Sequence, residues 1–191
     1  MLLLLYILII LFGLSSYFVG IKQMLKGQYS PSTFSRVIWV LLAINSFSGL
    51  VLSGGSKPSI ILGAIFLLGN TAICFVSFWK GTRFMGKLEY LCLILLFISA
   101  LIWIFFNAPF VNLVISLFAH FIGALPTIKR VWAEPKNESV GFWSLFFFAS
   151  LLSIFATKNM TLSSIIFPLY FVFFDGGMTV LSMRKVYTKN N

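Results

Sequence analysis

The chain has 191 residues, of which 60% are hydrophobic and 9% are charged, and its mean hydropathy is +1.02. Average soluble domains contain about 25% charged and about 45–50% apolar residues. This composition therefore excludes an ordinary soluble domain and indicates a protein embedded in a lipid bilayer. The 23 Phe, 5 Trp and 6 Tyr residues exclude intrinsic disorder.

The formal net charge of +10 does not indicate nucleic-acid binding, because the basic residues separate apolar runs instead of forming a patch. Membrane topology distributes Lys and Arg in this way. The two cysteines, Cys74 and Cys92, lie inside apolar runs and form neither a CxxC motif nor a zinc-binding spacing. We therefore expect no nucleic-acid partner, no metal and no cofactor.

A helix that crosses a bilayer needs about 20 mostly apolar residues, because each residue adds about 1.5 Å and the hydrocarbon core is roughly 30 Å thick. The first candidate has no basic residue before it and runs on to Gly20, so we expect a retained helix and not a cleaved signal peptide. Seven stretches are apolar enough, of which the second and sixth are short: 2–21, 37–53, 59–79, 88–106, 110–128, 140–157 and 162–183.

Basic residues alternate between the loops that these seven spans would leave. The first, third and fifth loops and the C-terminal tail hold three Lys or Arg residues each, whereas the second and sixth loops hold one each and the fourth holds none. Because positively charged loops stay in the cytoplasm, the odd loops and the C-terminus are predicted to be cytoplasmic and the N-terminus outside. We expect an integral, multi-pass protein of a cell membrane, either plasma or inner.

Spans 1–3 and spans 5–7 share one loop order, a long basic loop followed by a short polar loop. Two copies in the same orientation require one extra crossing between them, and the fourth span supplies it. The sequence therefore predicts an all-α membrane protein with seven transmembrane helices, arranged 3+1+3 as two parallel repeats and a linker helix. The first three-helix repeat would occupy residues 1–80, the linker helix 81–108, and the second repeat with its short basic tail 109–191.

Residue identity between the two halves is low. At an offset of 107 residues, identical residues pair at four of about thirty positions: Ile21-Lys22 with Ile128-Lys129, Ser32 with Ser139, and Ser46 with Ser153. The repeat is therefore predicted from topology and loop character, not from identity.

One cytoplasmic segment resembles a known family. Leu125–Trp132 has the sequence LPTIKRVW and is followed by Pro135 and Glu138-Ser139. It resembles the second PQ-loop of the SWEET/PQ-loop superfamily of membrane transporters, which has a Pro-Gln pair near the cytoplasmic end of the first helix of a three-helix repeat. Here Thr127 replaces the Gln, and Val19-Gly20 stands at the corresponding place in the first half.

The resemblance implies transport by alternating access, with Pro126 as a hinge in the fifth span. Gly20 would be its counterpart in the first span, acting through backbone flexibility. The alternative is that Pro126 only bends its helix to fit its neighbours, since membrane helices tolerate proline.

Four polar side chains are predicted to lie at one depth within the apolar spans: Asn45, Asn70, His120 and Asp175. Each stands nine or ten residues from the basic residue that bounds its span on the cytoplasmic side. That distance is about 14–15 Å along a helix, near half of the hydrocarbon core. An ionisable group at this depth costs at least about 2.5–3.5 kcal/mol and faces a cavity or a partner. Because transporters built from repeats bind substrate near the midplane, we expect these four residues to line a substrate site.

The family resemblance implies a role for two of them. In SWEET transporters, asparagines on the third helix of each repeat line the sugar pocket; Asn70 matches by type and position, and Asp175 by position only. The carboxyl group admits proton coupling, or a cationic or amphoteric substrate in place of a neutral sugar. If His120 and Asp175 face each other, they can hold a proton between them. Alternatively, each polar side chain only hydrogen-bonds a neighbouring helix.

The tryptophans near the cytoplasmic surface are expected to belong to the membrane belt and not to the site. Trp39 and Trp143 lie near the cytoplasmic ends of the second and sixth spans, and Trp132 lies just outside the fifth. Tryptophan is enriched at such positions because it anchors a protein at the lipid–water interface.

No catalytic pattern is present in the sequence. Of the four carboxylates, only Asp175 lies within a span, whereas Glu89, Glu134 and Glu138 lie at or beyond the cytoplasmic surface, away from the single histidine. There is no HExxH motif, nucleophile elbow or P-loop. We therefore do not expect an enzyme.

Together these patterns predict a membrane transporter that moves a small polar metabolite, sugar or amino-acid-like, with Asp175 as the carrier if protons drive transport. Its partners would be the metabolite, the lipid bilayer and, in a homo-oligomer, further copies of the chain. Two alternatives stay open. A non-transporting receptor or scaffold such as the KDEL-receptor family would have a polar cavity open on one side and a basic pocket, but no Lys or Arg lies at mid-depth. An assembly subunit would have no cavity at all.

Overall fold

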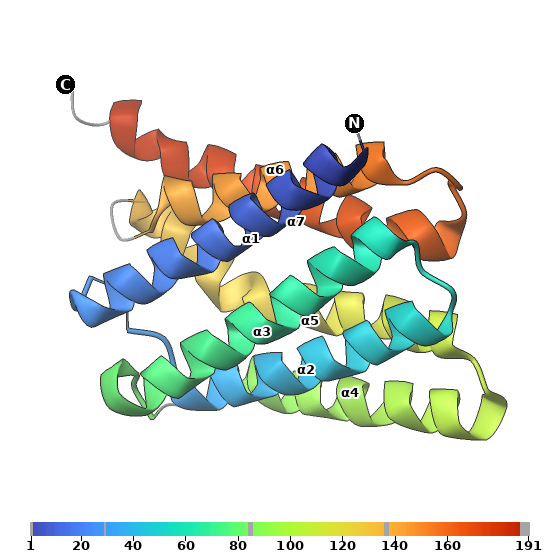
Figure 1. The fold of residues 1–191 in the computed structure, drawn as a ribbon. Helices are drawn as coiled ribbons and strands as arrows, with labels where there is room; N and C mark the ends of the chain where they lie inside the picture. The colour runs from blue at the N-terminus through green and yellow to red at the C-terminus, as the bar shows by residue number, and fades with distance from the viewer. Residues whose placement is uncertain (1, 29, 84–85, 136–137, 188–191) are drawn as a thin grey trace.

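The computed structural model describes residues 2–28, 30–83, 86–135 and 138–187. This part of the chain is helical, without β-strands (Figure 1), as the sequence predicts. The helices are α1 (Leu2–Leu25), α2 (Thr33–Leu52), α3 (Lys57–Lys80), α4 (Lys87–Phe106), α5 (Pro109–Ala133), α6 (Val140–Ala156) and α7 (Leu162–Tyr187). Each of the seven predicted spans coincides with one observed helix, so the predicted helical fold is confirmed.

Several helices extend beyond their predicted cytoplasmic ends. The second begins at Thr33 and not at 37, because the hydroxyl of Ser32 caps it by accepting a hydrogen bond from the Ser35 backbone N–H at 3.4 Å. Ser139 caps α6 in the same way, accepting from the Phe142 N–H at 3.3 Å. An apolar window detects the hydrocarbon-buried part of a helix but not its capped polar turn, which explains the difference.

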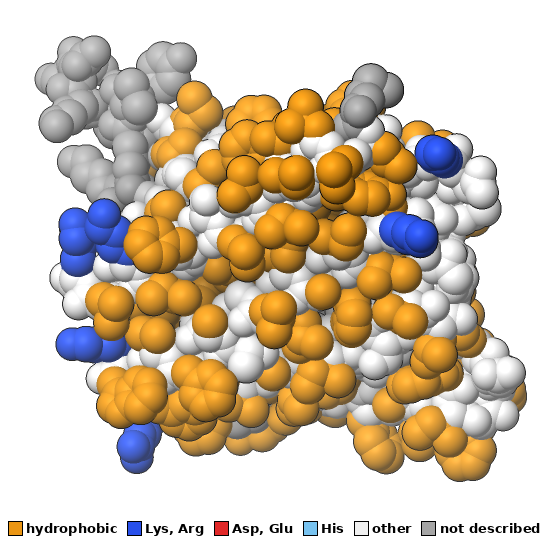
Figure 2. Space-filling model, in the orientation of Figure 1, with side chains coloured by type: hydrophobic (Ala, Val, Ile, Leu, Met, Phe, Trp, Pro, Cys, Tyr) orange, Lys and Arg blue, Asp and Glu red, His pale blue; other side chains and the backbone are white. Residues whose placement is uncertain are grey.

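The helices have the length and composition of membrane spans. In the described residues, six are long and apolar enough to cross a bilayer, and α6, with 17 residues, is shorter. Figure 2 shows hydrophobic side chains over the flank of the bundle. Large apolar side chains such as Leu3 and Phe173 are more than 70% exposed. A soluble monomer rarely exposes so much contiguous apolar surface. The chain is therefore a multi-pass integral membrane protein.

Charged side chains gather at one end of the bundle. Successive helices run in opposite directions, so the α1–α2, α3–α4 and α5–α6 connections lie at the same end as the end of α7 (Figure 1). We call this the basic end, because it holds most of the Lys and Arg side chains that the structure describes: Lys22, Lys26, Arg36, Lys80, Arg83, Lys87, Lys129, Arg130 and Arg184. The opposite end holds Lys57 and Lys158 (Figure 2). Lys136 and Lys189, which belong to the same predicted pattern, lie outside the described residues.

The helices pack as two sets of three, with α4 beside them. Helix α3 packs between α1 and α2, and α7 packs against both α5 and α6. The two sets of three helices meet where α1 packs on α6 and where α2 packs on α5. Helix α4 lies at the edge of the bundle, against α5 and α2. Six helices therefore surround the interior, and α4 stays outside it.

The interior differs between the two ends. Near the opposite end it is filled by fully buried apolar side chains from five helices, which we call the apolar plug: Ile9, Leu50, Leu62, Leu113 and Phe167. Burial of each such side chain contributes about 1.5–3 kcal/mol in water-to-apolar transfer, although within a bilayer close packing supplies the gain. The plug therefore occupies the interior between the opposite end and the middle of the bundle.

A buried polar cluster fixes α4 to its neighbours. The side-chain NH2 group of Asn45 on α2 lies 2.7 Å from the Ser99 hydroxyl on α4 and 2.8 Å each from the Asn112 Oδ1 and Ser116 hydroxyl on α5, so its two hydrogens are shared among three acceptors. The Asn112 amide donates back to the Asn45 carbonyl oxygen at 3.2 Å. The two serine hydroxyls donate to backbone carbonyl groups of their own helices, so their oxygens are free to accept from Asn45. We call these four residues the Asn45 cluster.

Asn45→Ala should destabilise the protein by about 1–2 kcal/mol, because it removes bonds each worth about 0.6 kcal/mol on average in a membrane protein and leaves Asn112 partly unpaired. The measurement is the free energy of unfolding in mixed detergent micelles as the fraction of SDS is raised. Asn159→Ala, at an exposed loop position, is the matched control and should change little. An equal effect of both substitutions would contradict the proposed role of the cluster.

Candidate functional site

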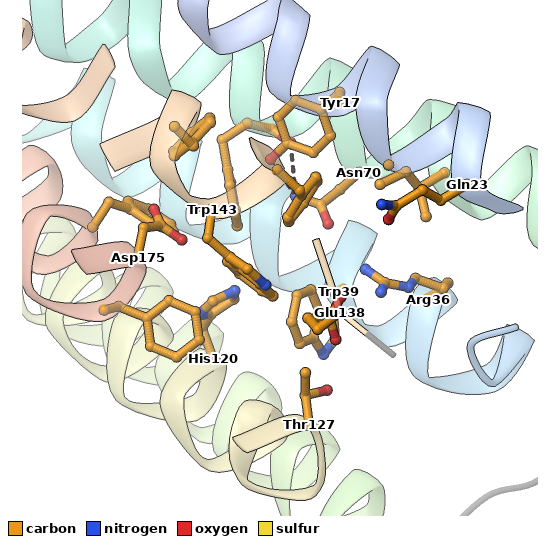
Figure 3. Close-up of a pocket in the computed structure, with 17 residues that line it drawn as sticks. Tyr17, Gln23, Arg36, Trp39, Asn70, His120, Thr127, Glu138, Trp143 and Asp175 are labelled. Atoms are coloured by element: carbon orange, nitrogen blue, oxygen red, sulfur yellow. Dashed lines mark hydrogen bonds between the residues drawn. The ribbon is translucent and has the colours of Figure 1, made fainter. Parts of the chain in front are cut away.

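A narrow cavity lies among the six inner helices. Its lining comes from α1, α2, α3, α5, α6 and α7 and from Glu138, and it begins at mid-depth and continues to the basic end (Figure 3). The cavity has a volume of about 30 Å³, which is room for about two water molecules. Three of the four predicted site residues line this cavity: Asn70, His120 and Asp175.

Asn70 is held by hydrogen bonds at the wall of the cavity. Its amide donates to the Tyr17 hydroxyl at 3.1 Å and to the Phe66 carbonyl oxygen at 2.8 Å. The Tyr17 ring lies directly over Gly69 of α3, at a place where a Cβ atom would overlap the ring. Gly69 thus allows α1 to deliver Tyr17 to Asn70. This pair forms a rigid polar edge of the cavity, and Tyr17 is a site residue that the sequence analysis did not identify.

His120 has one satisfied and one unsatisfied ring nitrogen. Nδ1 is 2.7 Å from the Tyr170 hydroxyl, whereas Nε2 is buried and has no hydrogen-bond partner among the described residues. The imidazole packs against aromatic rings, with centroid distances of 4.6 Å to Trp39 and 5.3 Å to Phe174. Tyr170 and not Asp175 is its partner, so the structure does not pair His120 with Asp175.

Asp175 is 3% exposed, and its Oδ2 atom has no hydrogen-bond partner in the described part of the chain. The indole Nε1 of Trp143, which lines the same cavity, is likewise buried without a partner. Figure 3 shows Trp143 lying between Asp175 and His120. Buried polar groups in proteins are nearly always hydrogen-bonded. Three buried polar atoms from α5, α6 and α7, each without a partner among the described residues, therefore lie along one cavity and are available to water or to a ligand.

Two of the three tryptophans assigned to the membrane belt lie elsewhere, whereas Trp132 is exposed. Trp39 and Trp143 are 8% and 5% exposed and line the cavity, so this prediction is wrong. Distance from the basic residues gave their depth correctly, but their helices turn these rings inward. A usable signal was present: Arg36 and Trp143 each stand four residues after a capping serine, Ser32 and Ser139, and both line the cavity.

Charged side chains occupy the basic-end part of the cavity, which we call the mouth. The Arg36 guanidinium is 7% exposed and lies 4.8 Å from the centre of the Trp39 ring, a cation–π contact. Glu138 is 6% exposed and pairs with Arg130 at 3.2 Å. Gln23 and Thr127 complete this part of the lining. The mouth therefore carries both signs of charge.

The remaining predicted residues have other surroundings. Asn45 does not line the cavity, because it faces α4 and α5 in the Asn45 cluster. Gly20 lines the cavity, and a Cβ atom there would approach the Phe142 ring to 2.9 Å, so it permits close packing of α1 on α6. Pro126 lies within α5, which continues to Ala133, and it borders a hollow of about 410 Å³ towards α2 and α4. The described residues contain no group of three His, Cys, Asp or Glu side chains placed to hold a metal ion.

Comparison with protein-family models, with curated proteins and with solved structures finds no match to this chain.

Gly69→Ala should destabilise the protein by about 1–3 kcal/mol, because the added methyl group overlaps the Tyr17 ring and must displace it from Asn70. Gly177→Ala is the matched control on α7, since nothing lies within 4 Å of a Cβ atom there. The measurement is again the free energy of unfolding in detergent. Equal stability of the two variants would show that Tyr17 is not fixed over Gly69.

Proposed function

We propose that the chain is a transporter that moves a small polar metabolite across the membrane by alternating access. The observation that carries the proposal is the set of unpartnered buried atoms of His120, Trp143 and Asp175 in one cavity at mid-depth. The hydroxyls of Ser153 and Ser182 are also buried without a partner among the described residues, but they do not line this cavity. A substrate site accounts for the convergence of the three atoms of His120, Trp143 and Asp175 on one space.

Helix packing supports a 3+1+3 repeat with kinship to the SWEET/PQ-loop superfamily. In a repeat, α1, α2 and α3 would correspond to α5, α6 and α7. The contacts of these six helices agree with this correspondence. The α1–α6 contact matches the α5–α2 contact, and the packing of α3 on α1 and α2 matches the packing of α7 on α5 and α6. The capping serines Ser32 and Ser139 match in the same way. Helix α4 has no counterpart, as expected of a linker between parallel repeats.

Alternating access requires that the two ends open in turn. Here the cavity extends towards the basic end, while the apolar plug fills the other half. Hydroxyl groups close the opposite end: Ser56 hydrogen-bonds Thr157 at 3.0 Å, and the Ser59 hydroxyl donates to the Ser164 carbonyl oxygen. We call these two bonds the hydroxyl latch. It joins the α2–α3 region to the α6–α7 region, so opening of this end would separate the two halves.

In this proposal the basic end faces the cytoplasm, in accordance with the positive-inside rule, and the membrane is the plasma or inner membrane. Pro126 would act as the hinge of α5. The hollow beside it gives the cytoplasmic end of α5 room to move. Gly20 would allow α1 and α6 to slide where they pack closely.

Opening of the opposite end can be tested without knowing the substrate. In a Cys74→Ala background, a Phe167→Cys thiol in the apolar plug should react with a membrane-impermeant maleimide added from the N-terminal side of the membrane, because the plug must open during the cycle. The native Cys92, 1% exposed where α4 packs on α5 and not part of the cavity lining, is the internal control and should stay unlabelled. Labelling of a Thr127→Cys thiol from the basic side alone, with none at position 167, would favour a receptor.

Removal of the hydroxyl latch should make that opening more frequent. With each bond worth about 0.6 kcal/mol, Ser59→Ala should raise the labelling rate at position 167 about threefold. Ser144→Ala, which removes a hydroxyl bonded within its own helix, should leave the rate unchanged. A rate insensitive to Ser59→Ala would remove the latch from the mechanism.

Asp175 would carry the proton if transport is driven by a pH gradient. In liposomes containing the protein, uptake of labelled sugars and amino acids should then respond to an imposed gradient, and Asp175→Asn should abolish the response because an amide does not exchange a proton in this range. Uptake by Asp175→Asn that follows the gradient as the wild type does would exclude this role.

A receptor without transport is the second candidate, and Arg36 favours it. A buried arginine at the mouth of a cavity reached from one end is suited to bind a carboxylate of a ligand from the cytoplasmic side. The labelling experiment at position 167 separates this function from transport.

A further inference from the structure

Asp175 carries a carboxyl group among aromatic side chains without a basic residue beside it. Among the residues that the structure describes, it forms no ion pair, and Figure 3 shows Arg36 on the far side of the cavity. A carboxylate buried in this way is expensive unless a positive charge or a proton accompanies it. The protein does not supply the positive charge, so a ligand is the natural source.

The walls of the cavity around Asp175 suit a cation. Phe142, Trp143, Phe171 and Phe174 line the space that Asp175 faces. The faces of aromatic rings attract ammonium groups, most strongly when the groups are removed from water. Neutral polyols need many hydrogen-bonding partners, and of the four rings that line the space beside Asp175 three are Phe rings, which offer none. A positive centre is thus better matched to the site than a sugar ring.

The other two unpartnered atoms specify a second feature of the ligand. The Trp143 Nε1–H group is only a donor, so it requires an acceptor. His120 Nε2 accepts or donates, depending on which partner holds the proton in its bond with Tyr170. A ligand that satisfies the site therefore needs an acceptor oxygen beside its cationic group. Room for about two water molecules limits the part that enters to a few heavy atoms.

We propose that the cavity binds a small primary-ammonium compound bearing a hydrogen-bond acceptor, with the ammonium group on Asp175 and the acceptor on Trp143 Nε1. This assignment rests on the proposed function and names the substrate class of the same site. Amino alcohols and amino acids belong to the class. In an amino acid the carboxylate would be the acceptor, on the side of the cavity that leads to Arg36.

The test compares three probes on the purified protein in detergent, with thermal unfolding as the readout, since a ligand that binds only the folded state raises its stability. Ethanolamine has an ammonium and a hydroxyl group; ethylene glycol has the same number of heavy atoms and no charge; glucose represents the neutral sugars. Ethanolamine at neutral pH should raise the unfolding temperature in a saturable manner. The two neutral probes at the same concentrations should not.

Substitutions in the cavity test whether stabilisation by ethanolamine arises from binding at Asp175 and Trp143. Asp175→Asn should weaken ethanolamine binding at least about tenfold, as expected when one partner of a buried charged pair is removed, whereas Glu134→Gln, an exposed carboxylate outside the cavity, should bind as the wild type does. Trp143→Phe keeps an aromatic ring and removes the donor, so it should also weaken binding. This variant and the ethylene glycol comparison keep the test decisive if Asp175→Asn does not fold.

Stabilisation by glucose or ethylene glycol equal to that by ethanolamine, no stabilisation by ethanolamine, or ethanolamine binding unaffected by Asp175→Asn would each overturn the assignment. These outcomes leave transport itself to the labelling of position 167, which needs no ligand. A neutral ligand with normal labelling refutes the substrate class alone, and ethanolamine binding without labelling refutes transport alone.

Discussion

A carboxyl group halfway across a lipid bilayer has no water to solvate it and must find its partner inside the protein or in a bound molecule. Asp175 finds none among the described side chains, although the same interior offers hydroxyl, amide, imidazole and indole groups. The helices around it turn aromatic rings and two further unpaired polar atoms to the same space. The interior of the bundle therefore combines the apolar plug near one end with a mid-depth cavity that contains a carboxyl group without a partner among the described side chains.

Two kinds of polar arrangement coexist at similar depth, and their contrast is informative. In the Asn45 cluster donors and acceptors meet within the protein, which is the usual means of holding membrane helices together. In the cavity, Asn70 is fixed by Tyr17 but its neighbours His120 and Asp175 keep free atoms. Polar residues at one level of the membrane thus divide into those that join helices and those available to a ligand. The division separates α4 and its contacts from the six helices around the cavity.

Hydropathy and the distribution of basic residues predicted the helices well, since the bilayer imposes both length and composition on each span. The start of α2 after Ser32 was missed because capping depends on a single hydroxyl group, whereas the start of α6 after Ser139 agrees with the prediction. Counting residues from the cytoplasmic boundary gave depth, which is a coordinate along the helix, and so brought Asn70, His120 and Asp175 to one level. It gave no information on rotation about the helix axis. For that reason Asn45 was predicted to line the site although it faces α4 and α5, and Trp143 was predicted to lie in the interfacial belt although it faces the cavity.

The Asn45 cluster also has a mechanical consequence. It hydrogen-bonds α2, in the first half of the chain, to α5, in the second half. The two halves are therefore joined along one flank of the bundle. Displacement between the halves is then smallest at this seam and grows with distance from it. Helices α1 and α6 lie on the other flank (Figure 1). If the two halves move relative to each other, they would rotate about this seam, and the largest separation would occur between α1 and α6.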